Sequence, residues 1–417
     1  MASRYAQSLL PWLFGFFVVF NLYLFPSLEQ SPRVTDALGV VFGLWLFWLL
    51  TTVGVRATPL IALLIFGVIP LLWGMYAFSA GDALSVTLSV RWLLAIPWGY
   101  ALFAIARNSE QRLGLVWGLW WGCVANVVVL VLQFYGFEQL TQNLGLAAQD
   151  SLLLQGYGMV RNPGMHGHPN ASTAVVSLIV PASLYLYYSR KAHIWVMLAG
   201  LGLLCVSVQF TLTRSPLLVS LVTVLVVFAA QRKLNRSLSL IALLLLTVPP
   251  ILYWVGPPGG WERWLDYANI ESSLGARSLS NFEALRISLE SPLGIGYEAA
   301  EQALWQDVAI GATHNAFLQI GVVYGLILAG AIALTMFALA SRTLAGIQDP
   351  WSLEAMVALQ LFGLFFFEEH LNNPVFIVLT NWLIAASVVQ IVDYFRVGKT
   401  QTVIAGQHMS QHFQAPR

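Results

Sequence analysis

The sequence has very little charge, and this shortage sets the class of protein. Only 9% of the 417 residues are Asp, Glu, Lys or Arg, against about 25% in a typical soluble domain. The hydrophobic share is 58% and the mean hydropathy is +0.73. A soluble fold could not bury so much apolar surface, and apolar runs of about 20 residues recur from end to end. Residues 1–417 are therefore predicted to form a single transmembrane domain.

Two further shortages exclude other classes. The two cysteines, Cys123 and Cys205, both lie in apolar runs, so they supply neither a disulfide framework nor a cysteine-rich metal site. Twenty Lys and Arg nearly balance nineteen Asp and Glu, for a net charge of +1, and no basic tract is long enough to bind nucleic acid. The sequence thus predicts no nucleic-acid partner, and cysteine usage does not indicate a redox compartment.

The apolar runs are long and continuous, which favours helices over barrel strands, because a segment in lipid must satisfy its own backbone polar groups. We expect an all-α polytopic membrane protein with about twelve transmembrane helices. No small-residue cleavage site follows the first run, so we expect it to stay as a helix. The predicted spans are 9–28, 37–55, 58–79, 83–106, 113–135, 168–188, 194–212, 216–230, 237–256, 316–340, 352–367 and 374–395.

The basic residues predict the orientation. If both termini are cytoplasmic, thirteen of the twenty Lys and Arg fall on the cytoplasmic side, which includes a tail at 397–417. Two long outer segments remain, 136–167 and 257–315, and long ordered loops often carry function. In the second loop, 278–291 and 297–310 have helical periodicity and are predicted to form short amphipathic helices at the outer interface. They could cover a cavity or lie among the headgroups.

Two arginines stand where charge is costly. Arg214 lies between two apolar runs with almost no loop, and no acid occurs in its turn. It could mark a helix end by snorkelling, but the missing acid favours an anion-binding side chain that points into a cavity. Arg91 lies within the fourth span with no acid nearby in sequence. It could bind a lipid phosphate or face a cavity, or the span could be placed differently.

The end of the first long loop is dense in turn formers and polar side chains. Arg161 opens this stretch, and His168, Pro169 and Asn170 lead into the sixth span. Pro169 and Asn170 suit a helix start, whose free N–H groups can bind an anion, although a capped helix entry needs no function. His166 and His168 alone are too few ligands for a metal site, so no metal is predicted.

The second long loop adds a further arginine and a histidine. Arg277 comes fifteen residues before Pro292, which begins a Pro-Leu-Gly-Ile-Gly turn, and Arg286 lies between them. His314 and Asn315 close the loop at the mouth of the tenth span. His314 could cap that helix or act as a general base, because the ordinary pKa of histidine is about 6.5.

Glu368 and Glu369 are the only acidic cluster in a short outer loop. Either carboxylate could assist or replace a histidine base, or both could belong to a solvated turn before Pro374. Several arginines, a histidine and few acids on one membrane face suit a pyrophosphate held at the bilayer surface. Because the planar guanidinium binds phosphate oxygens in pairs and stabilises a departing diphosphate, no metal would be obligatory.

At these residues the chain resembles the superfamily of O-antigen ligases, O-antigen polymerases and related bacterial oligosaccharyltransferases that use undecaprenyl-diphosphate-linked glycans. The resemblance covers about 160–330 by motif and departs at Leu328, where a small or polar residue is commoner. The three patches that carry it are Gly164-x-x-Gly167-His168-Pro169-Asn170, the stretch from Arg277 to Pro292-Leu-Gly-Ile-Gly296, and His314-Asn315 followed by nine residues and Gly325.

The resemblance implies a bacterial inner-membrane protein of the glycosyltransferase-C type, with a large periplasmic loop over a cavity. Arg161, Arg214 and Arg277 would bind the diphosphate, with Arg286 as a competitor, and His314 would deprotonate the acceptor hydroxyl. No cofactor is implied. Residues with possible accessory roles are His168, Asn170, Asn315, Glu368, Glu369 and Arg91.

The implied reaction is transfer of a finished O-polysaccharide from undecaprenyl diphosphate to a sugar hydroxyl of the lipid A-core, with inversion. Alternatives are an O-antigen or exopolysaccharide polymerase that uses the same donor, and glycan transfer to a protein. A lipid-linked glycan transporter is the alternative that is not an enzyme. It is disfavoured because the spans contain almost no carboxylates for an ion pathway and show no duplicated halves.

Overall fold

The structure is a computed structural model of the chain, and it describes residues 2–25, 31–52, 56–147, 154–156, 159–231, 267–308, 313–346, 349–367 and 373–412. Nearly all of its regular structure is helical. The elements are α1 (Ala2–Val19), α2 (Val34–Thr52), α3 (Ala57–Ala80), α4 (Ala83–Arg107), α5 (Ser109–Phe134), α6 (Glu138–Asn143), β1 (Leu154–Gly156), β2 (Met159–Arg161), η1 (Gly164–His166), α7 (Pro169–Val176), α8 (Ile179–Tyr188), α9 (Ile194–Thr211), α10 (Ser215–Ala230), α13 (Tyr267–Glu290), α14 (Tyr297–Val308), α15 (Ala316–Tyr324), α16 (Leu326–Ser341), η2 (Arg342–Ala345), α17 (Ser352–Phe367) and α18 (Pro374–His412).

Eight helical stretches in the described part of the chain are long and apolar enough to cross a membrane, which confirms a polytopic membrane fold. They are α2, α3, α4, α5, α7 with α8, α9, α16 with η2, and the first part of α18, Pro374–Phe395. The other four predicted spans are not among these eight. Shorter apolar helices occupy Leu9–Val19, Ser215–Ala230 and Ser352–Phe367, and 237–256 lies outside the described residues.

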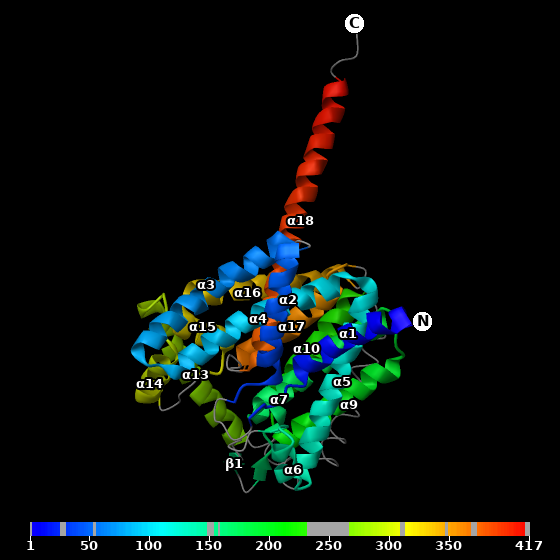
Figure 1. Cartoon of the computed structure of the whole chain (residues 1–417). Helices are drawn as coiled ribbons and strands as arrows, with labels where there is room; N and C mark the ends of the chain where they lie inside the picture. The colour runs from blue at the N-terminus through cyan, green and yellow to red at the C-terminus, as the bar shows by residue number, and fades with distance from the viewer. Residues whose placement is uncertain are drawn as a thin grey trace.

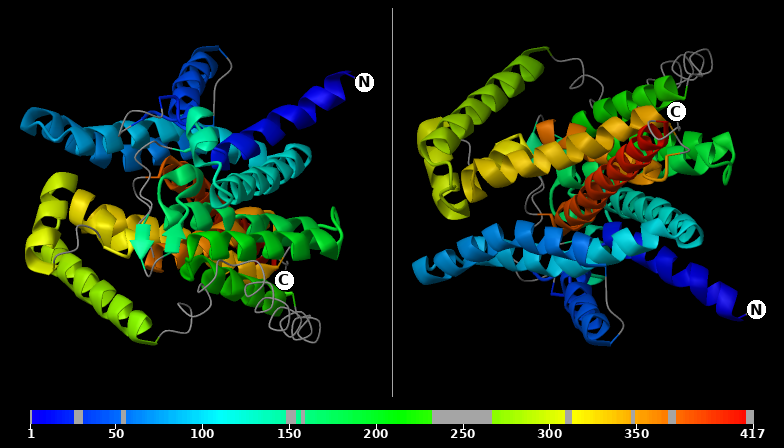
Figure 2. Two further views of the ribbon diagram at one scale, coloured as in Figure 1. Left: turned by 90° about the horizontal axis from the view of Figure 1, so that it is seen from below. Right: turned by 90° about the horizontal axis from the view of Figure 1, so that it is seen from above.

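The helices gather into one bundle with a long projection at one end. Helix α18 continues well beyond the bundle, and α6 with the β1–β2 hairpin lies at the opposite end, which we call the hairpin end (Figure 1). Strands β1 and β2 pair antiparallel, with Leu154 opposite Arg161. Helices α13 and α14 run along one side of the bundle, as the views along its axis show (Figure 2).

At two helix crossings, glycines let the helix backbones approach closely. Where α1 crosses α5, a Cβ on Gly118 would lie 2.0 Å from the carbonyl oxygen of Trp12, and one on Gly15 would lie 2.1 Å from that of Leu115. Where α4 meets α18, a Cβ on Gly99 would lie 2.6 Å from the Cβ of Asn381. Small residues at such crossings let backbones approach, which is how helices gain packing energy in lipid.

The prediction of one continuous span over 316–340 is wrong. The chain turns at Gly325, which separates the short helix α15 from α16. The backbone of Gly325 has φ +99° and ψ 156°, a region that is essentially limited to glycine. The turn exists because the Pro292–Gly296 segment packs against it: the N–H of Leu326 donates to the carbonyl of Pro292 at 3.0 Å. Two of the three sequence patches thus meet at this break.

Gly325→Val is expected to destabilise the fold by about 2 kcal/mol or more. The new side chain would occupy a backbone region that favours glycine, and its Cβ would lie 2.7 Å from the carbonyl oxygen of Pro292. The thermal midpoint of the purified protein in detergent measures the effect. Gly330→Val in α16 is the matched control, because a Cβ there meets nothing within 4 Å. Equal midpoints for the two variants would contradict the role of the turn.

Candidate active site at the hairpin end

Helix α7 begins at Pro169, as the sequence predicts, and its cap is His168. The Nδ1 atom of His168 accepts the backbone N–H of Asn170 at 3.2 Å. Pro169 suits the first helical position because its missing N–H would have no partner there. Since Nδ1 accepts this hydrogen bond, the proton of the neutral imidazole is assigned to Nε2. His168 can therefore donate a hydrogen bond through Nε2.

Arg161, at the end of β2, is held in a fixed orientation. Its Nε donates to the carbonyl of Thr211 at 2.8 Å, and its Nη2 donates to Oδ1 of Asn170 at 2.6 Å and to Oγ1 of Thr213 at 3.1 Å. The hydroxyl of Thr213 also donates to Oδ1 of Asn170, at 3.0 Å. This network joins the hairpin, the first turn of α7 and the connection between α9 and α10. A guanidinium held in this way needs little reorganisation to meet an anion.

Arg214 comes directly after Thr213 in the chain, and Thr213 belongs to this network. The connection from α9 to α10 turns through Leu212, which has φ +53°, and Arg214 is the residue before the first turn of α10. Because its neighbour Thr213 bonds to both Arg161 and Asn170, the backbone of Arg214 lies beside the same polar network. The structure therefore brings the predicted Arg214 close to Arg161.

His314, the predicted base, lies between two hydrogen-bonded neighbours. Asn315 caps α15 through a hydrogen bond from the N–H of Leu318 to its Oδ1 at 3.1 Å. The hydroxyl of Thr313 donates to the carbonyl of Asn315 at 2.8 Å, and the N–H of Thr313 donates to Oε1 of the buried Gln319 at 3.2 Å. Asn315 thus acts as the helix cap, and the half-buried imidazole of His314 stays at the mouth of α15.

The charges that act on the two histidines indicate that four of these residues lie near one another. Burial and the charge of nearby Arg161, with His314 contributing, lower the pKa of His168 to about 4. Burial and the charge of Arg277 lower the pKa of His314 to about 4. Both imidazoles are therefore neutral at pH 7, next to two guanidinium groups. We call Arg161, His168, Arg277 and His314 the histidine–arginine cluster.

Arg277 reaches the cluster from helix α13. Its Nη1 donates to the carbonyl of Phe367, the last residue of α17, at 3.0 Å. The predicted short helix over 278–291 is longer in the structure, because α13 runs from Tyr267 to Glu290 and places Arg277 in its interior. The helix is thus a rigid support for this side chain, and it is tied to the end of α17 by the side chain itself.

Arg286 does not share this environment. Its side chain is exposed and bonds to Glu283 and Glu290 of its own helix, with Nη1 2.8 Å from Oε1 of Glu290. The hydrogen bonds that its guanidinium donates to both carboxylates raise its pKa. Of the two competing loop arginines, the structure places Arg277 beside His314 and gives Arg286 carboxylate partners.

In an assay of the glycan transfer that the resemblance implies, Arg286→Gln is expected to keep the rate within about twofold of that of the unchanged protein, because an exposed ion pair contributes little. Arg277→Gln is expected to lower the rate at least tenfold, since it removes a cation beside the candidate base. Both variants are compared at matched membrane levels in a transfer assay. Equal losses in the two variants would contradict the assignment of Arg277 to the site.

Two other residues that the sequence analysis considers have partners of their own in the structure. Arg91 is buried in α4, and its Nε lies 3.7 Å from Oδ2 of Asp36 on α2. An acid that is distant in sequence thus compensates its charge. His166 is also buried, with its Nε2 3.0 Å from Oδ1 of Asn126, which suits a structural role. Glu368 and Glu369 lie outside the described residues.

The side chains of the cluster are of the types that bind anions and transfer protons. Two guanidiniums can bind phosphate oxygens, and a neutral imidazole can accept a proton from a hydroxyl. Within the described ranges, no group of three or more His, Cys, Asp or Glu side chains could hold a metal ion. No protein-family model matches the chain, and a comparison with curated proteins finds no match.

Proposed function

We propose that this protein is an O-antigen ligase, which transfers O-polysaccharide from undecaprenyl diphosphate to a sugar hydroxyl of the lipid A-core. The observation that carries the proposal is the histidine–arginine cluster, because its members come from three separate stretches of the chain. These stretches are the three that resemble the ligase and polymerase superfamily. The eight apolar helices are consistent with lipid-linked donor and acceptor.

In the proposed mechanism, Arg161 and Arg277 bind oxygens of the donor diphosphate, and Arg214 approaches from the next turn. His314 accepts the proton of the acceptor hydroxyl as that oxygen attacks the anomeric carbon from the face opposite the diphosphate. The bond from the anomeric carbon to the diphosphate oxygen breaks with inversion, and undecaprenyl diphosphate leaves. The guanidiniums stabilise the negative charge that develops on it. The proton on His314 then passes to solvent.

The proposal includes a location and an orientation. The hairpin end faces the periplasm, and both termini, with the tail at 397–417, lie in the cytoplasm of a bacterium with an inner membrane. The excess of Lys and Arg in the loops on the tail side supports this arrangement. The fold belongs to the glycosyltransferase-C type in this account, with twelve spans. Cysteine accessibility at engineered positions in each loop tests the orientation.

The pH profile should report the lowered pKa of His314. Because that pKa is about 4, the imidazole can accept a proton throughout the neutral range, and kcat/KM is expected to fall only below about pH 5. An ordinary histidine would give a fall near pH 6.5. The bound diphosphate is an anion and stabilises the protonated imidazole, so the acid limb of kcat is expected at a higher pH than that of kcat/KM. A fall of kcat/KM near pH 6.5 would contradict the environment described for His314.

A gel of lipopolysaccharide and of carrier-linked glycan, from cells with and without the gene, tests the function. A ligase predicts loss of all O-antigen from the core and long polymer retained on undecaprenyl diphosphate. Cores that bear a single repeat would indicate a polymerase instead. An unchanged profile would contradict both and direct attention to glycoproteins or exopolysaccharide.

A further inference from the structure

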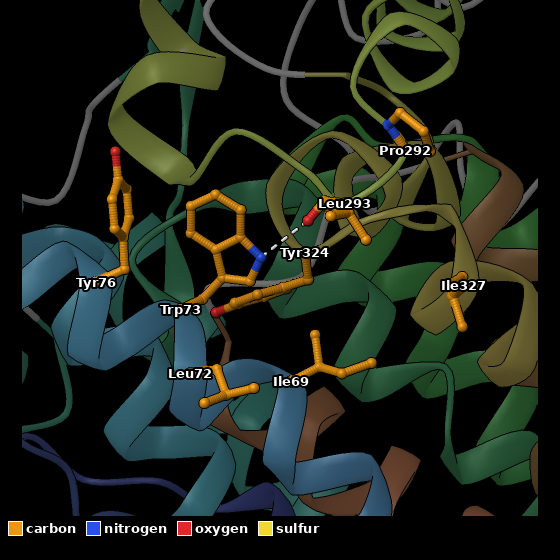
Figure 3. A pocket seen from close by; sticks show the side chains of 8 residues that line it. All are labelled: Ile69, Leu72, Trp73, Tyr76, Pro292, Leu293, Tyr324 and Ile327. Atoms are coloured by element: carbon orange, nitrogen blue, oxygen red, sulfur yellow. Dashed lines mark hydrogen bonds between the residues drawn. The ribbon is translucent and has the colours of Figure 1, made fainter.

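An apolar cavity on the outside of the bundle lies apart from the histidine–arginine cluster. It has a volume of about 390 Å³ between α3, the Pro292–Leu293 turn and the start of α16. Its walls are apolar, and Figure 3 shows the side chains that face it. The side chains of Leu72, Leu293 and Ile327 are 59%, 72% and 69% exposed. Since α3 and α16 are both long and apolar enough to cross a membrane, this exposed apolar part of the groove is suited to contact lipid chains.

The cavity continues into a polar one. A neighbouring pocket of about 240 Å³ shares Trp73 and Tyr76 with it and is also lined by Asp82, Glu298 and Gln302. The two together form one amphipathic groove, with an apolar half along α3 and a polar half at the connection between α3 and α4. Tyr76 and Trp73 lie at the junction, a position that aromatic residues favour at membrane–water interfaces.

The walls of the groove are fixed by hydrogen bonds, two of which join elements distant in sequence. The indole Nε1 of Trp73 donates to the carbonyl of Leu293 at 3.0 Å (Figure 3). The N–H of Tyr297 donates to Oγ of Ser85 at 2.8 Å, and the N–H of Ser85 donates to Oδ1 of Asp82 at 2.8 Å. The groove is therefore preformed, which lowers the entropic cost of binding a ligand.

The charge of the polar half limits what can bind. The two carboxylates lining it, Asp82 and Glu298, have no Lys or Arg beside them among the residues that line either part of the groove. A phosphate placed there would be repelled, whereas an ammonium group would be attracted. The arginines of the cluster lie near the opposite end of α15, a helix of nine residues or about 14 Å. The groove therefore does not suit a diphosphate headgroup.

We propose that this groove binds a phospholipid whose headgroup carries a primary ammonium, with one acyl chain along the apolar half and the ammonium at Glu298 and Asp82. The phosphate of such a lipid would remain in the solvated headgroup layer. The Pro292–Gly296 turn forms one wall, so the bound lipid would support the break at Gly325. This inference does not depend on the proposed glycan transfer.

The test uses the full chain in nanodiscs that contain equal amounts of phosphatidylethanolamine and phosphatidylglycerol with the same acyl chains. Mild detergent extraction followed by native mass spectrometry measures which lipid stays bound. We expect about tenfold preference for phosphatidylethanolamine, as one charge-assisted contact provides. Glu298→Gln should reduce the preference to threefold or less. Glu301→Gln, on the same helix but outside the lining of the groove, should keep it.

Ile327→Trp fills the apolar half and should lower the amount of retained phosphatidylethanolamine at least fivefold, while the protein keeps its thermal midpoint. Retention in proportion to the nanodisc composition, or a preference that Glu298→Gln leaves unchanged, would overturn the proposal. Displacement of phosphatidylethanolamine by an added polyprenyl phosphate would also overturn it, because the groove would then bind an anionic lipid.

Discussion

His314→Ala is expected to lower the rate of glycan transfer by about a thousandfold, as the loss of a general base typically does. The imidazole lies beside Arg277, and its neighbours Thr313 and Asn315 are fixed by hydrogen bonds to α15. Alanine removes the proton acceptor without changing these backbone bonds, so the protein should insert and purify normally. The measurement is transfer by purified protein with a defined lipid-linked donor.

His193→Ala is the matched control, because His193 is exposed and its side chain does not cap α9. It should retain the native rate. Added imidazole should partly restore His314→Ala if the lost group is a base, whereas it would not repair a packing defect. A His314→Ala protein that transfers within twofold of the native rate would contradict the mechanism and leave Glu368 or Glu369 as the candidate base.

Arg161→Ala is expected to lower kcat/KM for the lipid-linked donor by about a hundredfold or more, the usual cost of removing a preorganised charge from an anion site. The guanidinium is already oriented by Thr211, Asn170 and Thr213. Arg161→Lys keeps the charge but loses the planar fork, and we expect it to recover at most a tenth of the activity.

A control variant distinguishes binding of the diphosphate by Arg161 from a structural role of its side chain. Thr213→Val removes one hydrogen bond from the guanidinium but leaves the cation, so it should cost tenfold or less. The thermal midpoint of each variant is measured beside its activity. If Thr213→Val and Arg161→Ala lose equal activity and equal stability, Arg161 is a structural residue and the diphosphate site lies elsewhere.

Local sequence chemistry predicted the features that depend on near neighbours. The apolar runs indicated the membrane-crossing helices because a span is defined by its own composition. The start of α7 at Pro169 followed from the helix-initiating preference of proline. Predicting that Arg161, Arg277 and His314 lie near one another required the order of the three patches along the chain, since no single patch places its residues in space.

Features that depend on tertiary contacts could not be predicted. The break at Gly325 arises because the Pro292–Gly296 turn packs on it, and the apolar sequence around it otherwise favours one helix. Arg91 lacks an acid nearby in sequence, yet folding places Asp36 of α2 beside it. Gln319 bonds to the loop of His314, and Thr213 bonds to the guanidinium of Arg161. In the sequence, nothing marks these two residues as site residues except that they are polar in apolar surroundings.

The most direct test of the central claim is transfer by the purified protein in proteoliposomes. The substrates are an undecaprenyl-diphosphate-linked polysaccharide and lipid A-core, and the assay contains a chelator of divalent cations. The account predicts glycan on the core and free undecaprenyl diphosphate in equal amounts, with both products lost in His314→Ala. Absence of both products with the native protein, or products that require an added divalent metal, would contradict it.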